Sequence, residues 1–156
     1  GKADYTKGNR LLSREYRKGM SNWRFFGNAI LTFLTKIASG YWQIMDPQNG
    51  YTAISTDVLG RISLGDVYQR YGYCNDLLVR LNAQNAVIED VVIPARYGRE
   101  ASGIRYPVYI VKVSWLLLKD FFWRLKMKYV IFSFHPLVLF YLFGILMAPT
   151  GFLLGY

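Results

Sequence analysis

The sequence has very little cysteine and histidine. Among its 156 residues there is one cysteine, Cys74, and one histidine, His135. A single cysteine excludes a disulfide within the chain and a zinc site built from cysteine pairs. The histidine lies in an apolar stretch, where a position at the end of a helix explains it better than metal ligation. Proteins held together by disulfides or by cysteine-bound zinc are therefore excluded as classes.

Charged residues are absent from the last part of the sequence. Residues 129–156 contain no Asp, Glu, Lys or Arg, and this run is longer than the roughly 20 apolar residues that span a bilayer. Pro136 and the sequence APTG, which begins at Ala148, divide the run. The pattern predicts a helix over residues 135–148, a tight turn, and a second helix from Phe152. We therefore expect a transmembrane helical hairpin, truncated where the sequence stops.

Acidic residues are scarce relative to basic ones, 10 against 19, for a formal net charge of +9. The basic excess lies in residues 1–36 and 105–128, whereas residues 37–104 carry more acids than bases. Basic charge directly before a membrane segment places that side in the cytoplasm by the positive-inside rule. Nucleic-acid binding would also suit a basic, aromatic chain, but the charge-free tail argues against it. We expect a membrane partner, no nucleic acid, and a catalytic part on the cytoplasmic side.

Hydrophobic periodicity predicts several helices and one clear strand. Helices are expected over residues 24–39, 75–85 and 106–128, with a short one capped by Thr56 and an alternating strand over 86–96. The helix over 106–128 mixes aromatic and basic residues, which is typical of an amphipathic helix at a membrane surface. In the first helix, one face carries Phe26, Ile30, Phe33, Leu34 and Ile37. This order of elements suits the second half of an α/β domain.

Two clusters of polar residues in the first half of the chain are candidates for binding. Arg10 and Arg24 stand near glycines and amides, and the planar guanidinium fork suits phosphate oxygens. Asp46, Gln48 and Asn49 belong to the sequence DPQNG. These three residues either cap their own turn or face a ligand.

Two further clusters lie in the second half of the chain. Asp76 stands at the start of a predicted helix, where free N–H groups favour a carboxylate. It is either a simple cap or an acid that points into a cleft. Arg96 and Arg99 follow a strand that ends at Pro94. Ligands bind at the carboxyl ends of strands in open α/β sheets, so these arginines either contact a diphosphate or belong to a solvated loop.

The order of these motifs resembles family 2 glycosyltransferases of GT-A fold. The motifs are DYTKGNR, WRFFGN, DPQNGY, YCNDLL and VVIPARYGREASGI, followed by FHPL. The nearest subgroup is the membrane-attached polyprenyl-phosphate sugar transferases, similar to dolichol-phosphate mannose synthases. The resemblance implies an α/β fold with three parts: the C-terminal, acceptor half of a Rossmann-like GT-A domain over residues 1–104, a juxtamembrane amphipathic helix over 105–128, and the transmembrane hairpin over 129–156.

The resemblance also implies roles for the candidate residues. Arg10 and Arg24 match positions that hold the phosphate of the acceptor lipid. Asp46, Gln48 and Asn49 match a segment near the sugar pocket. Asp76 matches the acidic position that is the catalytic base in many family members. Arg96 and Arg99 lie in a match to the loop that closes over the diphosphate.

The implied function is transfer of a sugar from a nucleotide sugar to a polyprenyl (dolichyl or undecaprenyl) phosphate at the cytoplasmic face of the membrane. A divalent metal, Mg²⁺ or Mn²⁺, is expected from the family. The family's Asp-x-Asp metal motif is missing from this sequence, so the ligands would lie in a donor-binding N-terminal half outside the chain. That half or a second copy of the chain would be a further partner.

Two alternatives stay open. The acceptor is a hydroxyl of a lipid-linked glycan or polysaccharide, and Asp76 then acts as a general base. Otherwise the chain is a non-catalytic, membrane-anchored partner that binds lipid head groups through its basic segments.

Overall fold

A computed structural model of the chain describes residues 3–10, 22–94, 106–132 and 136–155. The strands are β1 (Tyr5–Asn9), β2 (Thr52–Ile54) and β3 (Ile88–Val92). The α-helices are α1 (Asn22–Ser39), α2 (Thr56–Arg61), α3 (Tyr73–Ala83), α4 (Tyr106–Leu125) and α5 (Leu137–Leu154). A 3₁₀ turn, η2 (Leu64–Asp66), precedes α3, and a π-helical segment, η3 (Lys126–Phe132), continues α4.

The expected α/β fold class is wrong. The described residues are mostly helical, and their strands form one small sheet of order β2-β1-β3. Strand β1 pairs antiparallel with β2 and parallel with β3. The aromatic run that precedes Asp46 forms turns instead of a strand, because Pro47 and the hydrogen-bonding side chains that follow it favour turn conformations. The sheet therefore stays small, and most of the apolar sequence lies in helices.

The expected transmembrane hairpin is wrong as well. Residues Leu137–Leu154 form a single helix that continues through Pro149. The Thr150 hydroxyl donates to the carbonyl oxygens of Leu146 and Met147, each at 3.0 Å. Because Pro149 has no backbone N–H, one backbone hydrogen bond of the helix is missing, and the Thr150 hydroxyl bonds to carbonyl oxygens next to that position. Within the described parts of the chain, no helix combines the length and the apolar character that crossing a bilayer requires.

Four predicted elements are confirmed in type and approximate position. The helices expected over residues 24–39, 75–85 and 106–128 correspond to α1, α3 and α4, and the strand expected over 86–96 corresponds to β3. The short helix α2 is also present, but its cap is Ser55 instead of Thr56. The Ser55 hydroxyl accepts a hydrogen bond from the Val58 N–H at 3.4 Å.

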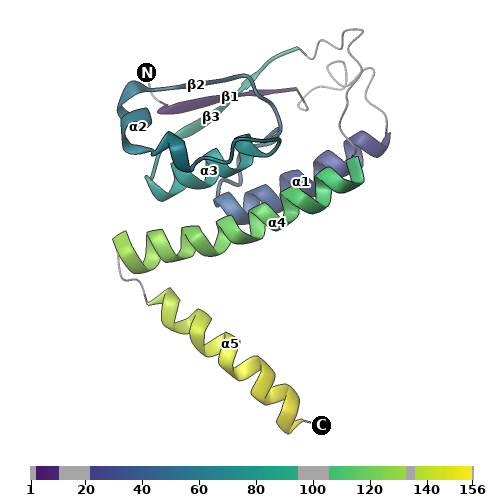
Figure 1. Ribbon diagram of the computed structural model, residues 1–156, viewed down its shortest axis with the longest axis vertical. Coiled ribbons are helices and arrows are strands. Elements are labelled where there is room, and N and C mark those ends of the chain that lie inside the picture. The colour runs from purple at the N-terminus through teal and green to yellow at the C-terminus, as the bar shows by residue number, and fades with distance from the viewer. Residues whose placement is uncertain (1–2, 11–21, 95–105, 133–135, 156) are drawn as a thin grey trace.

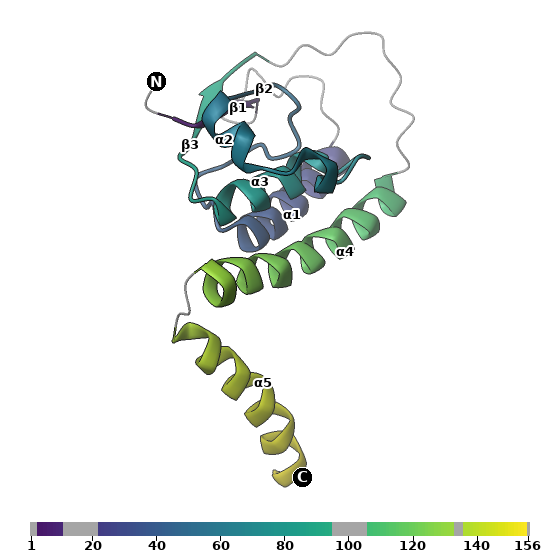
Figure 2. The ribbon, with the colours of Figure 1, turned by 60° about the vertical axis from the view of Figure 1, so that its left-hand side comes forward.

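Helix α3 lies between the sheet and the helices α1 and α4, and α5 extends away from this assembly (Figures 1 and 2). Two apolar cores meet at α3. The first joins it to the sheet and to α2, with buried members Tyr5, Tyr41, Ile44, Val58, Ile62, Leu78, Leu81, Ala86 and Ile88. The second joins it to α1 and α4, with buried members Leu31, Ala38, Val79, Val113 and Leu117. Because burying one such side chain is worth about 1.5–3 kcal/mol, α3 is the element on which both layers depend.

The face of α1 that the sequence pattern marks as apolar is mostly exposed. Phe26 and Phe33 are each 56% exposed, and Ile30 and Ile37 are each 37% exposed. The buried side of α1 carries Leu31 and smaller residues instead. Small residues allow close approach to α4, and a Cβ at Gly27 would lie 3.2 Å from Ile110 Cδ1. An apolar strip of α1 is thus left uncovered.

Gly40 ends α1 under a constraint that a substitution would test. Its φ is +77°, and a Cβ there would overlap the Arg124 guanidinium, which donates to the Ile37 carbonyl oxygen at 3.2 Å. We expect Gly40→Ala to destabilise the fold by about 2–4 kcal/mol in urea unfolding, from backbone strain and overpacking. Gly60→Ala is the matched control, because a Cβ at this α2 position meets nothing within 4 Å. The control should be neutral or stabilising by up to about 1 kcal/mol, and equal effects of the two substitutions would contradict this account.

Candidate substrate site

Polar side chains gather at the carboxyl ends of the parallel strands β1 and β3. Alternation along β1 puts Tyr5, Lys7 and Asn9 on one face, and all three are buried. In the parallel register Lys7 lies opposite Asp90. The face therefore changes from apolar at Tyr5 to polar at Asn9 as the strand proceeds. The carboxyl end of a parallel pair is where open sheets bind ligands.

Arg10 and Asp46, both predicted site residues, form an ion pair at this end of the sheet. The Arg10 Nε donates to Asp46 Oδ2 at 2.7 Å, and its Nη2 donates to Oδ1 at 3.1 Å. The Arg10 backbone N–H adds a bond to Oδ2 at 3.2 Å. The Asp46 side chain is 1% exposed and that of Arg10 is 27% exposed. Asp46 thus orients the guanidinium, instead of presenting free oxygens to a sugar.

Asn49 has a backbone role that corresponds to the turn interpretation of DPQNG. Its Nδ2 donates to the Gly8 carbonyl oxygen at 2.8 Å, and its Oδ1 accepts the Tyr51 N–H at 3.0 Å. Its own carbonyl oxygen accepts a bond from the buried Lys7 Nζ at 2.6 Å. A Cβ at Gly8 would lie 2.8 Å from Asn49 Nδ2 and 2.5 Å from Ile93 Cδ1, so the strand needs glycine there. Burial lowers the pKa of Lys7.

Gln48 connects the turn to the helical layer. Its Nε2 donates to Asn75 Oδ1 at 3.1 Å, and its Oε1 accepts the Tyr109 hydroxyl at 2.5 Å. Asn75 also accepts a bond from the Thr35 hydroxyl of α1 at 3.3 Å. One partly buried amide therefore links the turn to α1, α3 and α4.

Asp76 lies in the first turn of α3 and is 2% exposed. Its Oδ2 accepts the Tyr68 N–H at 2.7 Å, and Arg80 Nε donates to Oδ1 and Oδ2 at 3.0 and 3.1 Å. The Arg80 guanidinium lies 4.9 Å from the centroid of the Trp123 ring. Both oxygens of the predicted base are thus engaged, and the helix cap itself is Gly72, with a φ of +121°.

Asp120 of α4 faces this pair. It is 8% exposed, and its Oδ2 is buried without a hydrogen-bond partner in the described part of the chain. Burial, then the negative charge of Asp76, raises the pKa of Asp120 to about 7, against the opposing effect of Arg80 and Lys119. The α3–α4 contact thus contains two acids that share the neighbourhood of one arginine.

Several predicted groups cannot be placed. Arg96, Arg99 and the side chain of Arg24 lie outside the described residues. Among the residues that the structure does describe, no three His, Cys, Asp or Glu side chains are arranged to hold a metal ion. The Mg²⁺ or Mn²⁺ expected from the resemblance, with ligands outside the chain, stays a prediction.

Sequence reasoning missed five polar residues of this region. They are Lys7, Asn9, Asp90, Tyr109 and Asp120. The sequence of β1, YTKGN, does not alternate between polar and apolar residues, so no local pattern marks Lys7 and Asn9 as buried. No local pattern marks Asp120 as buried, since it stands between charged and aromatic residues of an amphipathic helix.

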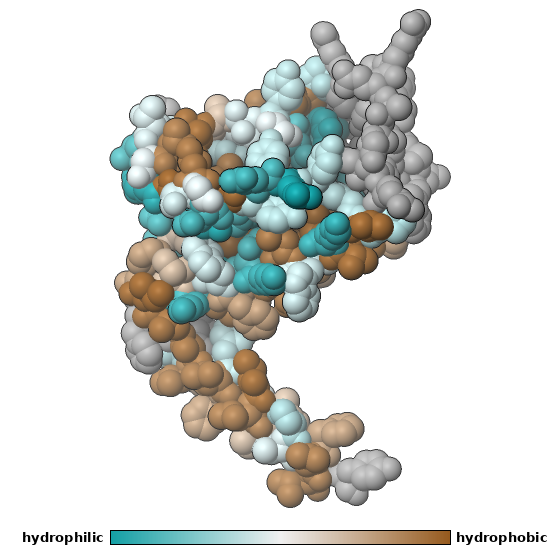
Figure 3. Space-filling view, in the orientation of Figure 1, coloured by the Kyte–Doolittle hydropathy of each residue, from teal (hydrophilic) through white to brown (hydrophobic). Residues whose placement is uncertain are grey.

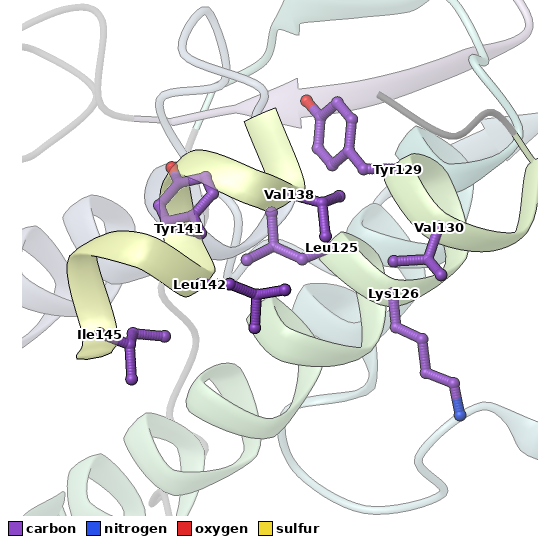
Figure 4. Close-up of a pocket in the computed structure, with 8 residues that line it drawn as sticks. All are labelled: Leu125, Lys126, Tyr129, Val130, Val138, Tyr141, Leu142 and Ile145. Carbon is purple, nitrogen blue, oxygen red and sulfur yellow. The ribbon is translucent and has the colours of Figure 1, made fainter. Parts of the chain in front are cut away.

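Two hollows are lined by described residues. An open depression of about 530 Å³ is lined by Gln69, Arg70, Tyr71 and Tyr73, and the Tyr71 ring meets Tyr109 edge-on at 6.4 Å. A narrower apolar cavity of about 190 Å³ lies between η3 and α5 (Figure 4). It is lined by Leu125, Lys126, Tyr129, Val130, Val138, Tyr141, Leu142 and Ile145.

The Arg10–Asp46 ion pair leads to a prediction about the stability of the fold. Arg10→Ala should cost about 2–4 kcal/mol, because it leaves a buried carboxylate without its counter-ion. The double variant with Asp46→Asn should cost less than the sum of the two single changes by about 1–3 kcal/mol. Urea unfolding of the four proteins in this cycle measures the coupling. Additivity within about 0.5 kcal/mol would show that the pair is not energetically coupled.

The raised pKa of Asp120 leads to a prediction about how the free energy of unfolding depends on pH. Its pKa of about 7 in the folded state exceeds the ordinary value of 3.8, so the native protein binds more protons between these values and loses stability as pH rises through them. Asp120→Asn removes this loss. The variant should gain about 1–3 kcal/mol relative to wild type between about pH 4 and pH 8, measured by unfolding at each pH. The exposed Asp57→Asn is the control and should show no such trend; a pH-independent difference for Asp120→Asn would refute the assignment.

Comparison with known proteins does not identify a family for the chain. No protein-family model matches it, and no significant similarity to curated proteins or to solved structures is found. These comparisons therefore leave the resemblance to family 2 glycosyltransferases as a prediction from motif order.

Proposed function

We propose that the chain takes part in transfer of a sugar from a nucleotide sugar to a polyprenyl phosphate at a membrane surface. The observation that carries the choice of acceptor is the engagement of both Asp76 oxygens by Arg80 and the Tyr68 N–H. A carboxylate whose two oxygens are both held by hydrogen bonds is suited to positioning other groups. A phosphate acceptor has a second pKa of about 6 and is largely ionised at pH 7, so it needs no base. A hydroxyl acceptor would need one.

The reaction is a substitution at the sugar's anomeric carbon. An oxygen of the acceptor phosphate forms a bond to that carbon, and the bond from the carbon to the diphosphate oxygen breaks. The nucleoside diphosphate leaves with the electron pair. Since the described residues offer no metal site, the proposal assigns no step to the divalent cation, which residues outside the chain would hold.

Arg10 is the proposed contact for the acceptor phosphate. Its guanidinium is fixed by two bonds to Asp46 and stays partly exposed. A fork held in one orientation loses less side-chain entropy when it binds a phosphate. Asp46 supports binding by positioning Arg10, and Arg24 is the second proposed phosphate contact.

The apolar surface supports a location at the bilayer. Exposed apolar residues follow one stripe of α4, and Lys112, Lys119 and Lys126 recur every seven residues beside it. Hydrophobic side chains also cover α5 (Figure 3). Apolar surface with adjoining lysines favours anionic lipid surfaces. The cavity between η3 and α5 is apolar, with Lys126 among its lining residues (Figure 4), and suits part of an isoprenoid chain whose phosphate is anionic.

Asp76→Asn tests the choice of acceptor. The full-length protein is assayed for transfer from nucleotide sugars to polyprenyl phosphate and, separately, to hydroxyl acceptors. We expect kcat with the phosphate acceptor to fall by less than about tenfold, because only positioning is disturbed. Asp57→Asn, a change at an exposed acid on α2, is the control and should have no effect.

Two results would contradict the proposal. A loss of kcat beyond about a thousandfold in a folded Asp76→Asn protein, with KM unchanged, would identify a general base and favour a hydroxyl acceptor. Binding to anionic vesicles without transfer from any nucleotide sugar would favour the non-catalytic alternative.

A further inference from the structure

Asp90 is an acid of the strand-end cluster to which the proposed reaction assigns no role. It lies in the middle of β3, opposite Lys7 in the parallel register. Its Oδ2 accepts bonds from Asn9 Nδ2 at 2.8 Å and from the Met45 N–H at 2.9 Å. These two bonds hold the carboxylate between β1 and the segment that leads into the DPQNG turn.

The second carboxylate oxygen of Asp90 differs from the first in its hydrogen bonding. Its Oδ1 is buried and has no hydrogen-bond partner within the described residues. In contrast, the neighbouring Asp46 has bonds on both oxygens, and the Lys7 ammonium donates to the Asn49 carbonyl oxygen. An acceptor left unsatisfied in the interior costs about 1–3 kcal/mol, and most buried polar groups in native proteins avoid this cost. Burial also raises the pKa of Asp90, so a donor that bonds to Oδ1 would relieve an existing penalty.

The surrounding charges restrict what that donor is. Two cations, Lys7 and Arg10, and two acids, Asp46 and Asp90, meet at this end of the sheet. A metal ion would be repelled by the cations, and the described residues offer no third ligand. At Asp90 Oδ1 itself, an anion would be repelled by the carboxylate to which that oxygen belongs. A neutral hydroxyl group satisfies the oxygen without changing the charge balance.

We propose that Asp90 Oδ1 accepts a hydrogen bond from a hydroxyl of the transferred sugar and positions that sugar next to Arg10. This inference rests on the proposed function, because it takes the sugar as the polyhydroxylated ligand. Asp90 then recognises this hydroxyl, while the charges of Lys7 and Arg10 balance those of Asp46 and Asp90.

Sugar binding by the full-length protein tests this directly. The probes are methyl glycosides of mannose, glucose and galactose, followed by saturation-transfer NMR at millimolar concentrations. We expect at least one glycoside to bind and Asp90→Ala to weaken it by about tenfold or more, the loss of one bond to a charged group. Asp90→Asn has the same shape and keeps an oxygen for Asn9 and Met45, so it should fold and still weaken binding by about three- to tenfold.

Monodeoxy analogues of the bound glycoside give the readout that a merely structural role would not change. Removal of one particular hydroxyl should weaken binding to wild type about tenfold, and should have little further effect in Asp90→Ala. Glu89→Gln is the matched control, because this neighbouring acid is exposed on the opposite face of β3. The inference is overturned if no glycoside binds, or if folded Asp90 variants bind as wild type does. Asp90-dependent binding without any transfer to polyprenyl phosphate would instead overturn the proposed function alone.

Discussion

The buried carboxylate of Asp46 must be neutralised, and this requirement organises the polar end of the molecule. An ionised carboxylate with almost no solvent contact is stable only when a counter-ion and hydrogen bonds replace its water. Arg10 supplies both from the end of β1. Once this pair forms, the turn that follows Asp46 lies against β1, which brings Asn49 to Gly8 and Lys7. The predicted phosphate-binding and sugar-pocket residues are neighbours for this reason.

Helix α3 connects the polar end of the sheet to the rest of the fold. Its apolar residues belong to both cores. Its first turn contacts the site through Asn75, and Arg80 in its last turn lies against Trp123 of α4. Helix α4 also reaches the site through the Tyr109–Gln48 bond. A helix with an apolar and basic outer stripe is therefore connected, by buried hydrogen bonds, to the residues proposed to hold the sugar and phosphate.

The local spacing of apolar residues was sufficient to predict which segments form helices or strands. It was insufficient to predict which of their faces are buried. Spacing of apolar residues located α1, α3, α4 and β3, since a helix or strand forms largely from its own residues and their caps. The same spacing put Phe26 and Phe33 on one apolar face of α1 but did not show that this face is mostly exposed. It also predicted a hairpin where α5 continues through Pro149. Which face is covered depends on the partner helices, and periodicity does not contain that information.

The sequence by itself determined the low cysteine content, the basic segments 1–36 and 105–128, and the charge-free tail. It also identified Arg10, Asp46, Gln48 and Asp76 as candidate site residues. The tertiary structure decided what these residues do: Asp46 holds Arg10, Gln48 joins helices, and Asp76 is engaged by Arg80. It also buried Asp120 and one carboxylate oxygen of the partly buried Asp90. Role and burial depend on contacts between residues far apart in the chain, such as Asn9 with Asp90, and the free energy of a buried charge depends on which partners the fold brings to it.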